Sequence, residues 1–159
     1  MNKIISRCIF IVSIGMWVIL SFATPWVLGD NNTFLKNFVN QELLNVLGVF
    51  VAITLASTAN LHLEFNNIEY AVHKTFLTGT RAAVKKSAFS MIVLFALAVV
   101  VVVVKPLFNT SSEITMSFMN GLALLIILFN ILVLTDLTKL VFKIEPLHKM
   151  MGDDEHQEK

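Results

Sequence analysis

Four long stretches of the chain contain no charged residue. A helix rises about 1.5 Å per residue, so runs of roughly 18 to 22 residues cross a hydrocarbon layer about 30 Å thick. A lipid-exposed backbone must satisfy its own hydrogen bonds, and these runs are too long and too continuously apolar for barrel strands. The pattern predicts an all-α integral membrane protein with four transmembrane helices, at residues 8–29, 43–63, 87–104 and 114–135.

Composition agrees with this assignment and leaves little chain for a soluble domain. The 159 residues are 56% hydrophobic and only 14% charged. We expect residues 1–143 to form the transmembrane domain with a helical extension at about 64–86, and residues 144–159 to form a solvated, mobile tail. The basic start of the first stretch resembles a signal peptide, but its apolar part is longer than a usual signal core. We therefore expect the first segment to be retained.

Positive charges divide unevenly between the two sets of loops that these spans create. Ten Lys and Arg residues lie on the side of both termini, and only Lys36 and Lys105 lie on the other. Cytoplasmic loops carry the excess of Lys and Arg, which predicts both termini in the cytoplasm. In the first outer loop, Phe34, Leu35 and Phe38 have helical spacing, which favours either a short interfacial helix or a partly ordered loop.

Small and amide side chains indicate where the helices pack. Helices in lipid associate through close packing and polar contacts, because lipid tails are as apolar as leucine. In the second span, Gly48, Ala52, Ala56 and Ala59 form one edge of small side chains, which we call the small edge. We favour packing of this edge within one chain, with packing between subunits as the alternative. Asn130 is expected to make an interhelical hydrogen bond, with a pore contact as the alternative. The predicted packing residues are Gly48, Ala52, Ala56, Ala59, Asn120 and Asn130.

The segment after the second span, "NLHLEFNNIEYAVHK", is polar but has helical periodicity. No proline or glycine interrupts residues 49–77, and Gly79 is the first good terminator. The second helix is therefore expected to have a total length of about 50 Å and to extend several turns past the membrane into the cytoplasm. Projection at 100° per residue gives two polar stripes, one of Asn60, Glu64 and Asn67 and another that continues the small edge. We predict an assembly or partner interface at His62, Asn66, Glu69 and His73.

Two sharper interpretations of that stripe remain open beside the interface. The first is a metal site, because histidine and carboxylate side chains one turn apart can share a metal ion. The second is a proton or pH-sensing role for the histidines, because histidine titrates near neutral pH. Metal binding is not our prediction, because His62 lies seven residues before Glu69. No cofactor is expected. Further along, Arg81, Lys85 and Lys86 are expected to contact anionic lipid or dock a partner.

The motifs of enzymes and carriers do not occur in this chain. We find no Ser/His/Asp constellation, phosphate-binding glycine loop or paired carboxylates, so an enzyme is not expected. A proton-coupled carrier usually has a carboxylate within a span, and none of the four spans contains one. The preferred interpretation is a homo-oligomeric membrane subunit that presents its cytoplasmic helix to a soluble protein. The alternative is a small oligomeric ion channel or a holin-like pore, lined by Asn120, Asn130 and the small edge of the second span.

The four-span layout and the segment "TANLHLEFNNIE" (residues 58–69) resemble the membrane subunit of Kiwa-type bacterial phage-defence systems, KwaA. The resemblance covers the layout of most of the chain and one short segment. It implies a homo-oligomer in the bacterial inner membrane that responds to phage attack at the envelope. It also implies a cytosolic DNA-binding partner, KwaB, so direct nucleic-acid binding by this chain is not expected.

Overall fold

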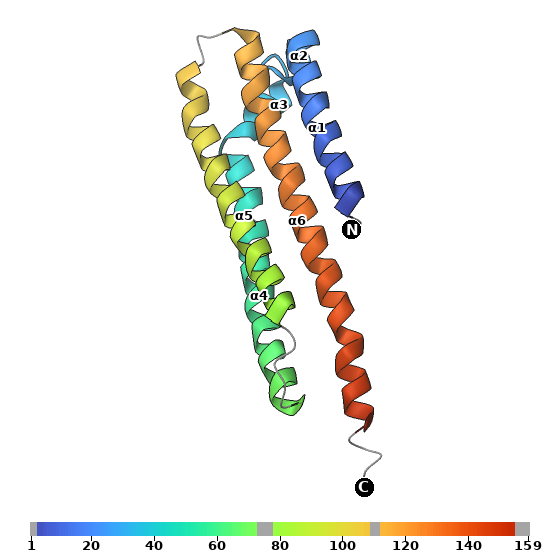
Figure 1. Cartoon of the computed structure of the whole chain (residues 1–159). Coiled ribbons are helices and arrows are strands. Elements are labelled where there is room, and N and C mark those ends of the chain that lie inside the picture. Colours follow the sequence, from blue (N-terminus) through green and yellow to red (C-terminus); the bar gives the residue numbers. More distant parts are fainter. Residues whose placement is uncertain (1–2, 73–77, 109–111, 155–159) are drawn as a thin grey trace.

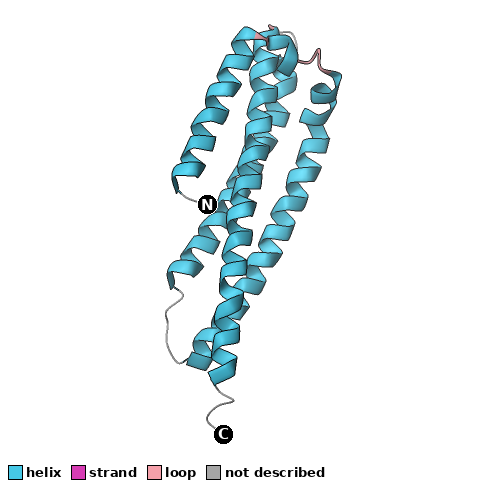
Figure 2. Ribbon diagram, turned by 90° about the vertical axis from the view of Figure 1, so that its right-hand side faces the viewer, coloured by secondary structure: helices cyan, strands magenta, loops and turns pink. Residues whose placement is uncertain are grey.

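The computed structural model describes residues 3–72, 78–108 and 112–154, and side chains within 8–70, 78–108 and 112–139. Every regular element in these ranges is helical (Figures 1 and 2). Three helical segments are long and apolar enough to cross a membrane: Thr33–Tyr70, Thr78–Phe108 and Glu113–Lys139. The all-helical prediction is therefore confirmed for the described residues, with three candidate spans of sufficient length.

The first predicted span is divided into two helices. Helix α1 covers Lys3–Ala23 and helix α2 covers Pro25–Leu28. Proline lacks an N–H and disfavours a helical residue before it, and Thr24 accordingly has non-helical dihedral angles. Because of this break, the described apolar part of the first helix is Cys8–Ala23, shorter than the 22 residues predicted.

The next segment bends before it enters a long helix. Helix α3 (Thr33–Asn37) is capped by the Asn32 side chain, which accepts hydrogen bonds from the Phe34 and Leu35 N–H groups. The π-helix η1 (Phe38–Glu42) contains a kink with non-helical angles at two residues, and helix α4 (Leu43–Val72) follows. The predicted short helix is thus present, and Leu35 is buried inside the protein.

The second half of the chain returns twice along the bundle. Helix α5 covers Thr78–Val104, the 3-10 helix η2 covers Lys105–Phe108, and helix α6 covers Glu113–Asp154. Helix α6 lies centrally, with α1 on one side and the α4–α5 pair on the other (Figure 1). It continues past residue 143, so most of the predicted tail is helical, while residues 155–159 lie outside the described ranges.

Two apolar clusters hold the bundle together. One joins α4, α5 and α6 along the bundle through Leu43, Leu47, Ala98, Ala123 and others. The second lies near the α4–α5 connection and consists of Leu61, Phe65, Ile68, Val84 and Leu137. We call this part of the molecule, residues 58–70 and 78–87, the hairpin end. The opposite part, residues 24–42, 105–108 and 112–113, is called the loop end.

Candidate functional site

The hairpin end consists of the packed ends of α4 and α5, with Leu137 of α6 in the apolar cluster between them. Helix α4 runs without a break through Glu64 and ends at Val72, a length of about 45 Å at 1.5 Å per residue. The apolar side chains between the polar stripes are buried, since Leu61, Phe65 and Ile68 are 7%, 0% and 5% exposed. Gly79 lies in the first turn of α5, so its predicted role as the terminator of the second helix is wrong.

Arg81 joins the two residue sets that were predicted separately. Its Nη2 atom donates to Glu69 Oε2 at 2.6 Å and to Asn66 Oδ1 at 2.8 Å. The Glu69 side chain is 12% exposed and that of Arg81 25% exposed, so much of this ion pair is shielded from solvent. Two members of the predicted interface and one member of the predicted basic set therefore form a single polar contact that fastens α4 to α5.

A cavity of about 220 Å³ lies beside this contact. Its walls come from α4 and α5: Thr58, His62, Phe65, Arg81, Val84 and Lys85. Two of its polar lining groups, Thr58 Oγ1 and Arg81 Nε, are buried without a hydrogen-bond partner among the described residues. The cavity thus combines two basic side chains, a histidine and an unpaired hydroxyl.

Other predicted residues of the hairpin end lie outside the cavity or outside the described region. Lys86 is exposed and does not line the cavity. His73 falls outside the described residues, so its membership of the polar stripe stays a prediction. Among the residues that are described, no group of three His, Cys, Asp or Glu side chains could hold a metal ion.

Most of the small edge of α4 is not covered by the other helices of the chain. Ala52, Ala56 and Ala59 are exposed, and Gly48 is half-buried with its Cα face toward Phe95. The other helices cover the neighbouring face of α4, which carries the buried Thr54. The preference for packing within one chain is therefore wrong for the three alanines.

The loop end contains a buried polar cluster that the sequence did not predict. The Lys105 ammonium lies 3.0 Å from Asp30 Oδ1, and the Lys105 side chain is only 9% exposed. Asn120, fully buried, donates from Nδ2 to the Leu28 carbonyl at 2.8 Å and to Asp30 at 3.0 Å. This cluster connects the end of α2 to η2 and α6, so the packing role predicted for Asn120 is performed by hydrogen bonds.

Asp30 is ionised because its partners outweigh its burial. Burial alone would raise its pKa above the usual 3.8, but hydrogen bonds from Asn120 and Lys105 and the charges of Lys105 and Lys36 lower the pKa. The Asp30 carboxylate is therefore charged at neutral pH. A charged lysine this far from water depends on the carboxylate that faces it.

Asn130 is buried, as expected for an amide inside a helix bundle, but its hydrogen bond is local. Its Nδ2 donates to the Ile126 carbonyl of the same helix at 2.9 Å, and its Oδ1 has no partner among the described residues. The predicted interhelical hydrogen bond is therefore wrong. A side-chain bond to the preceding turn satisfies the donor without requiring a second helix.

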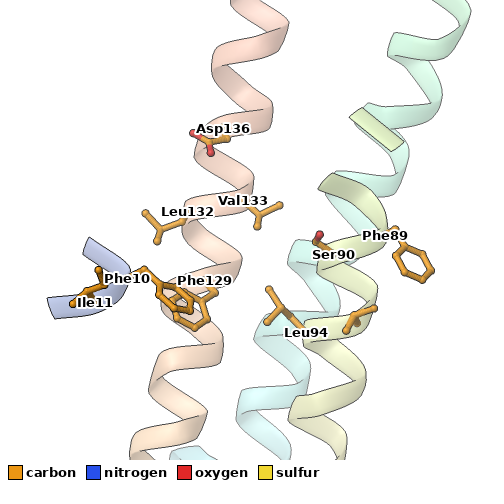
Figure 3. A pocket seen from close by; sticks show the side chains of 10 residues that line it. Phe10, Ile11, Phe89, Ser90, Leu94, Phe129, Leu132, Val133 and Asp136 are labelled. Atoms are coloured by element: carbon orange, nitrogen blue, oxygen red, sulfur yellow. The ribbon is translucent and has the colours of Figure 1, made fainter. Parts of the chain in front are cut away.

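An open apolar cleft of about 710 Å³ lies along α6. Figure 3 shows Phe10 and Ile11 of α1 on one side, Phe129, Leu132 and Val133 of α6 behind, and α5 on the other side. Phe10 stacks on Phe129 with ring centroids 4.9 Å apart. Helices α1 and α5 both pack on α6, and the cleft lies between them. Its apolar lining is suited to acyl chains or another apolar helix.

Comparison with known proteins returns no relative: no family model, no curated protein and no solved structure matches the chain.

Proposed function

We propose that the chain is a non-enzymatic, multi-pass subunit of the bacterial inner membrane. In this proposal it has four spans with both termini cytoplasmic, and it forms a homo-oligomer that presents the hairpin end to a soluble cytosolic protein. The carrying observation is the hairpin end itself, which is fastened by Arg81 and packed on an apolar cluster that it shares with α6. A part packed in this way needs no further folding to serve as a binding surface.

The exposed surface of the hairpin end has the composition of a protein interface. Tyr70 is 82% exposed and Leu63 is 62% exposed, beside the exposed polar residues His62, Asn66 and Asn67. Aromatic side chains surrounded by polar groups are typical of binding hot spots. The exposed alanines of α4 support contact between copies of the chain, because small residues let helix backbones approach closely in lipid.

The resemblance to KwaA gives this architecture its proposed biological setting. We propose a sensor of phage attack at the envelope, with the cytosolic partner resembling KwaB. The alternative of an ion channel or holin-like pore receives less support. Asn120 and Asn130, the residues expected to line the pore, are buried within a single chain and bonded there.

Tyr70→Ser tests the binding surface. Co-purification with the soluble protein encoded beside the gene should fall at least about tenfold, because an exposed aromatic hot spot typically contributes 2 kcal/mol or more. The thermal midpoint should stay unchanged, since most of this side chain is outside the fold. Leu107→Ser, at a 77% exposed position of the loop end, is the matched control and should retain the partner.

Two further readouts make this test decisive. Native mass spectrometry of the purified protein should show more than one copy, and a single copy would contradict the oligomer. Equal partner recovery with wild type and Tyr70→Ser would contradict the binding surface. Ion flux through liposomes containing the chain alone would support the pore instead.

A further inference from the structure

The cavity of the hairpin end has the chemistry of an anion site. Its polar lining consists of Thr58 and His62 from α4 and of Arg81 and Lys85 from α5, over an apolar floor of two further residues. The described lining includes no carboxylate. Arginine and lysine form charge-assisted hydrogen bonds with phosphate, and a hydroxyl can donate to a phosphate oxygen. The lining therefore favours a group that only accepts hydrogen bonds and carries negative charge.

Unpaired donors distinguish this cavity from an ordinary basic surface. Thr58 Oγ1 and Arg81 Nε are both shielded from solvent and without partners among the described residues. Buried polar groups are usually hydrogen-bonded, and leaving one unpaired costs free energy. Glu69 engages only the Nη2 corner of the guanidinium, so the Nε donor stays available. Both groups would be satisfied by one tetrahedral anion with several acceptor oxygens.

Size and position both fit a phosphate group. A volume of about 220 Å³ would hold about seven waters at roughly 30 Å³ each, enough for a phosphate with part of an attached glycerol. Thr58 belongs to the candidate span Thr33–Tyr70, one turn before the first histidine of the polar segment. The cavity therefore lies where the apolar part of α4 becomes polar, which is the level of lipid headgroups if the segment crosses a bilayer.

We propose that the cavity binds a net-anionic phosphate group through Thr58, His62, Arg81 and Lys85. A phospholipid headgroup and a soluble phosphate ester share this chemistry. The site rests on the proposed function only for its level in the membrane, because binding itself requires neither the partner nor the oligomer.

The test uses the full chain in a zwitterionic detergent. Native mass spectrometry compares dioleoylphosphatidylglycerol with dioleoylphosphatidylcholine, and calorimetry measures glycerol 3-phosphate as the soluble arm. Thr58→Val and Lys85→Gln should each weaken phosphate binding about tenfold, the usual cost of losing one hydrogen bond to a charged group. Lys86→Gln is the matched control. It removes the same charge from the next residue in the chain, whose side chain does not line the cavity.

The variants also separate binding from folding. Thr58→Val removes a buried hydroxyl that has no partner, so the ligand-free protein should be as stable as wild type or slightly more stable. Selective loss of the phosphatidylglycerol complex in both cavity variants supports a lipid source, and the same loss for glycerol 3-phosphate supports a soluble one. Equal losses in Lys85→Gln and Lys86→Gln would overturn the site, as would unchanged binding by Thr58→Val.

Discussion

Asp30→Ala is expected to destabilise the protein by about 3 kcal/mol, the usual cost of removing one partner from a buried ion pair. The Lys105 side chain is only 9% exposed, and the substitution leaves its ammonium group without the carboxylate that faces it. It also removes one hydrogen-bond acceptor from Asn120. The loss should appear as a lower thermal midpoint in detergent, measured by circular dichroism.

A double substitution identifies the ion pair as the cause. Asp30→Ala combined with Lys105→Met replaces both charges by apolar groups, and should recover most of the lost stability because no charge is left unpaired. Lys36→Ala removes one exposed positive charge from the same region and should change stability little. A midpoint for Asp30→Ala within a degree of wild type would contradict the structural role assigned to this cluster.

Gly121→Ala is expected to separate α1 from α6. A Cβ at this position would lie 2.2 Å from Trp17 Cδ1 and 2.4 Å from its Nε1, far inside van der Waals contact. The indole also packs edge-on against Phe118, with ring centroids 4.9 Å apart. The ring must therefore move out of its place, and overpacking of this kind typically costs about 1–3 kcal/mol.

Gly15→Ala provides the matched control, because a Cβ there meets no atom within 4 Å. It replaces glycine by alanine inside α1, where alanine is the better helix former, so stability should be unchanged or slightly higher. Limited proteolysis should cut α1 faster in Gly121→Ala than in wild type or Gly15→Ala. Identical proteolysis and identical thermal midpoints for the two variants would show that α1 does not pack on α6 as described.

The sequence predicted the hairpin end well because the signal there is local. The unbroken periodicity after residue 60 predicted the continuation of α4, and the structure adds that Leu61, Phe65 and Ile68 are buried there. The contact between Glu69 and Arg81 was missed although its signal was available. Two antiparallel helices joined by a short connection place residues at similar distances from that connection opposite each other. The two predicted sets could therefore have been recognised as one contact.

The polar cluster of the loop end could not be predicted from local patterns. Asp30 and Asn120 are 90 residues apart in the chain, and Asp30 follows helix α2 whereas Asn120 lies inside helix α6. Only the packing of α2 against α6 brings them together. The break in the first span had a visible signal in Pro25, which the count of uncharged residues ignored.

The membrane orientation of α4 is the point on which the proposed function depends most. Cys8 is the only cysteine, so a Cys8→Ser background allows a single cysteine to be placed either before or after the apolar part of α4. Asn37 and Asn67 are both exposed and lie before and after its apolar part. A membrane-impermeant maleimide should label Asn37→Cys in spheroplasts of intact inner membrane, and Asn67→Cys only after permeabilisation. Labelling of Asn67→Cys without permeabilisation would contradict a cytoplasmic hairpin end.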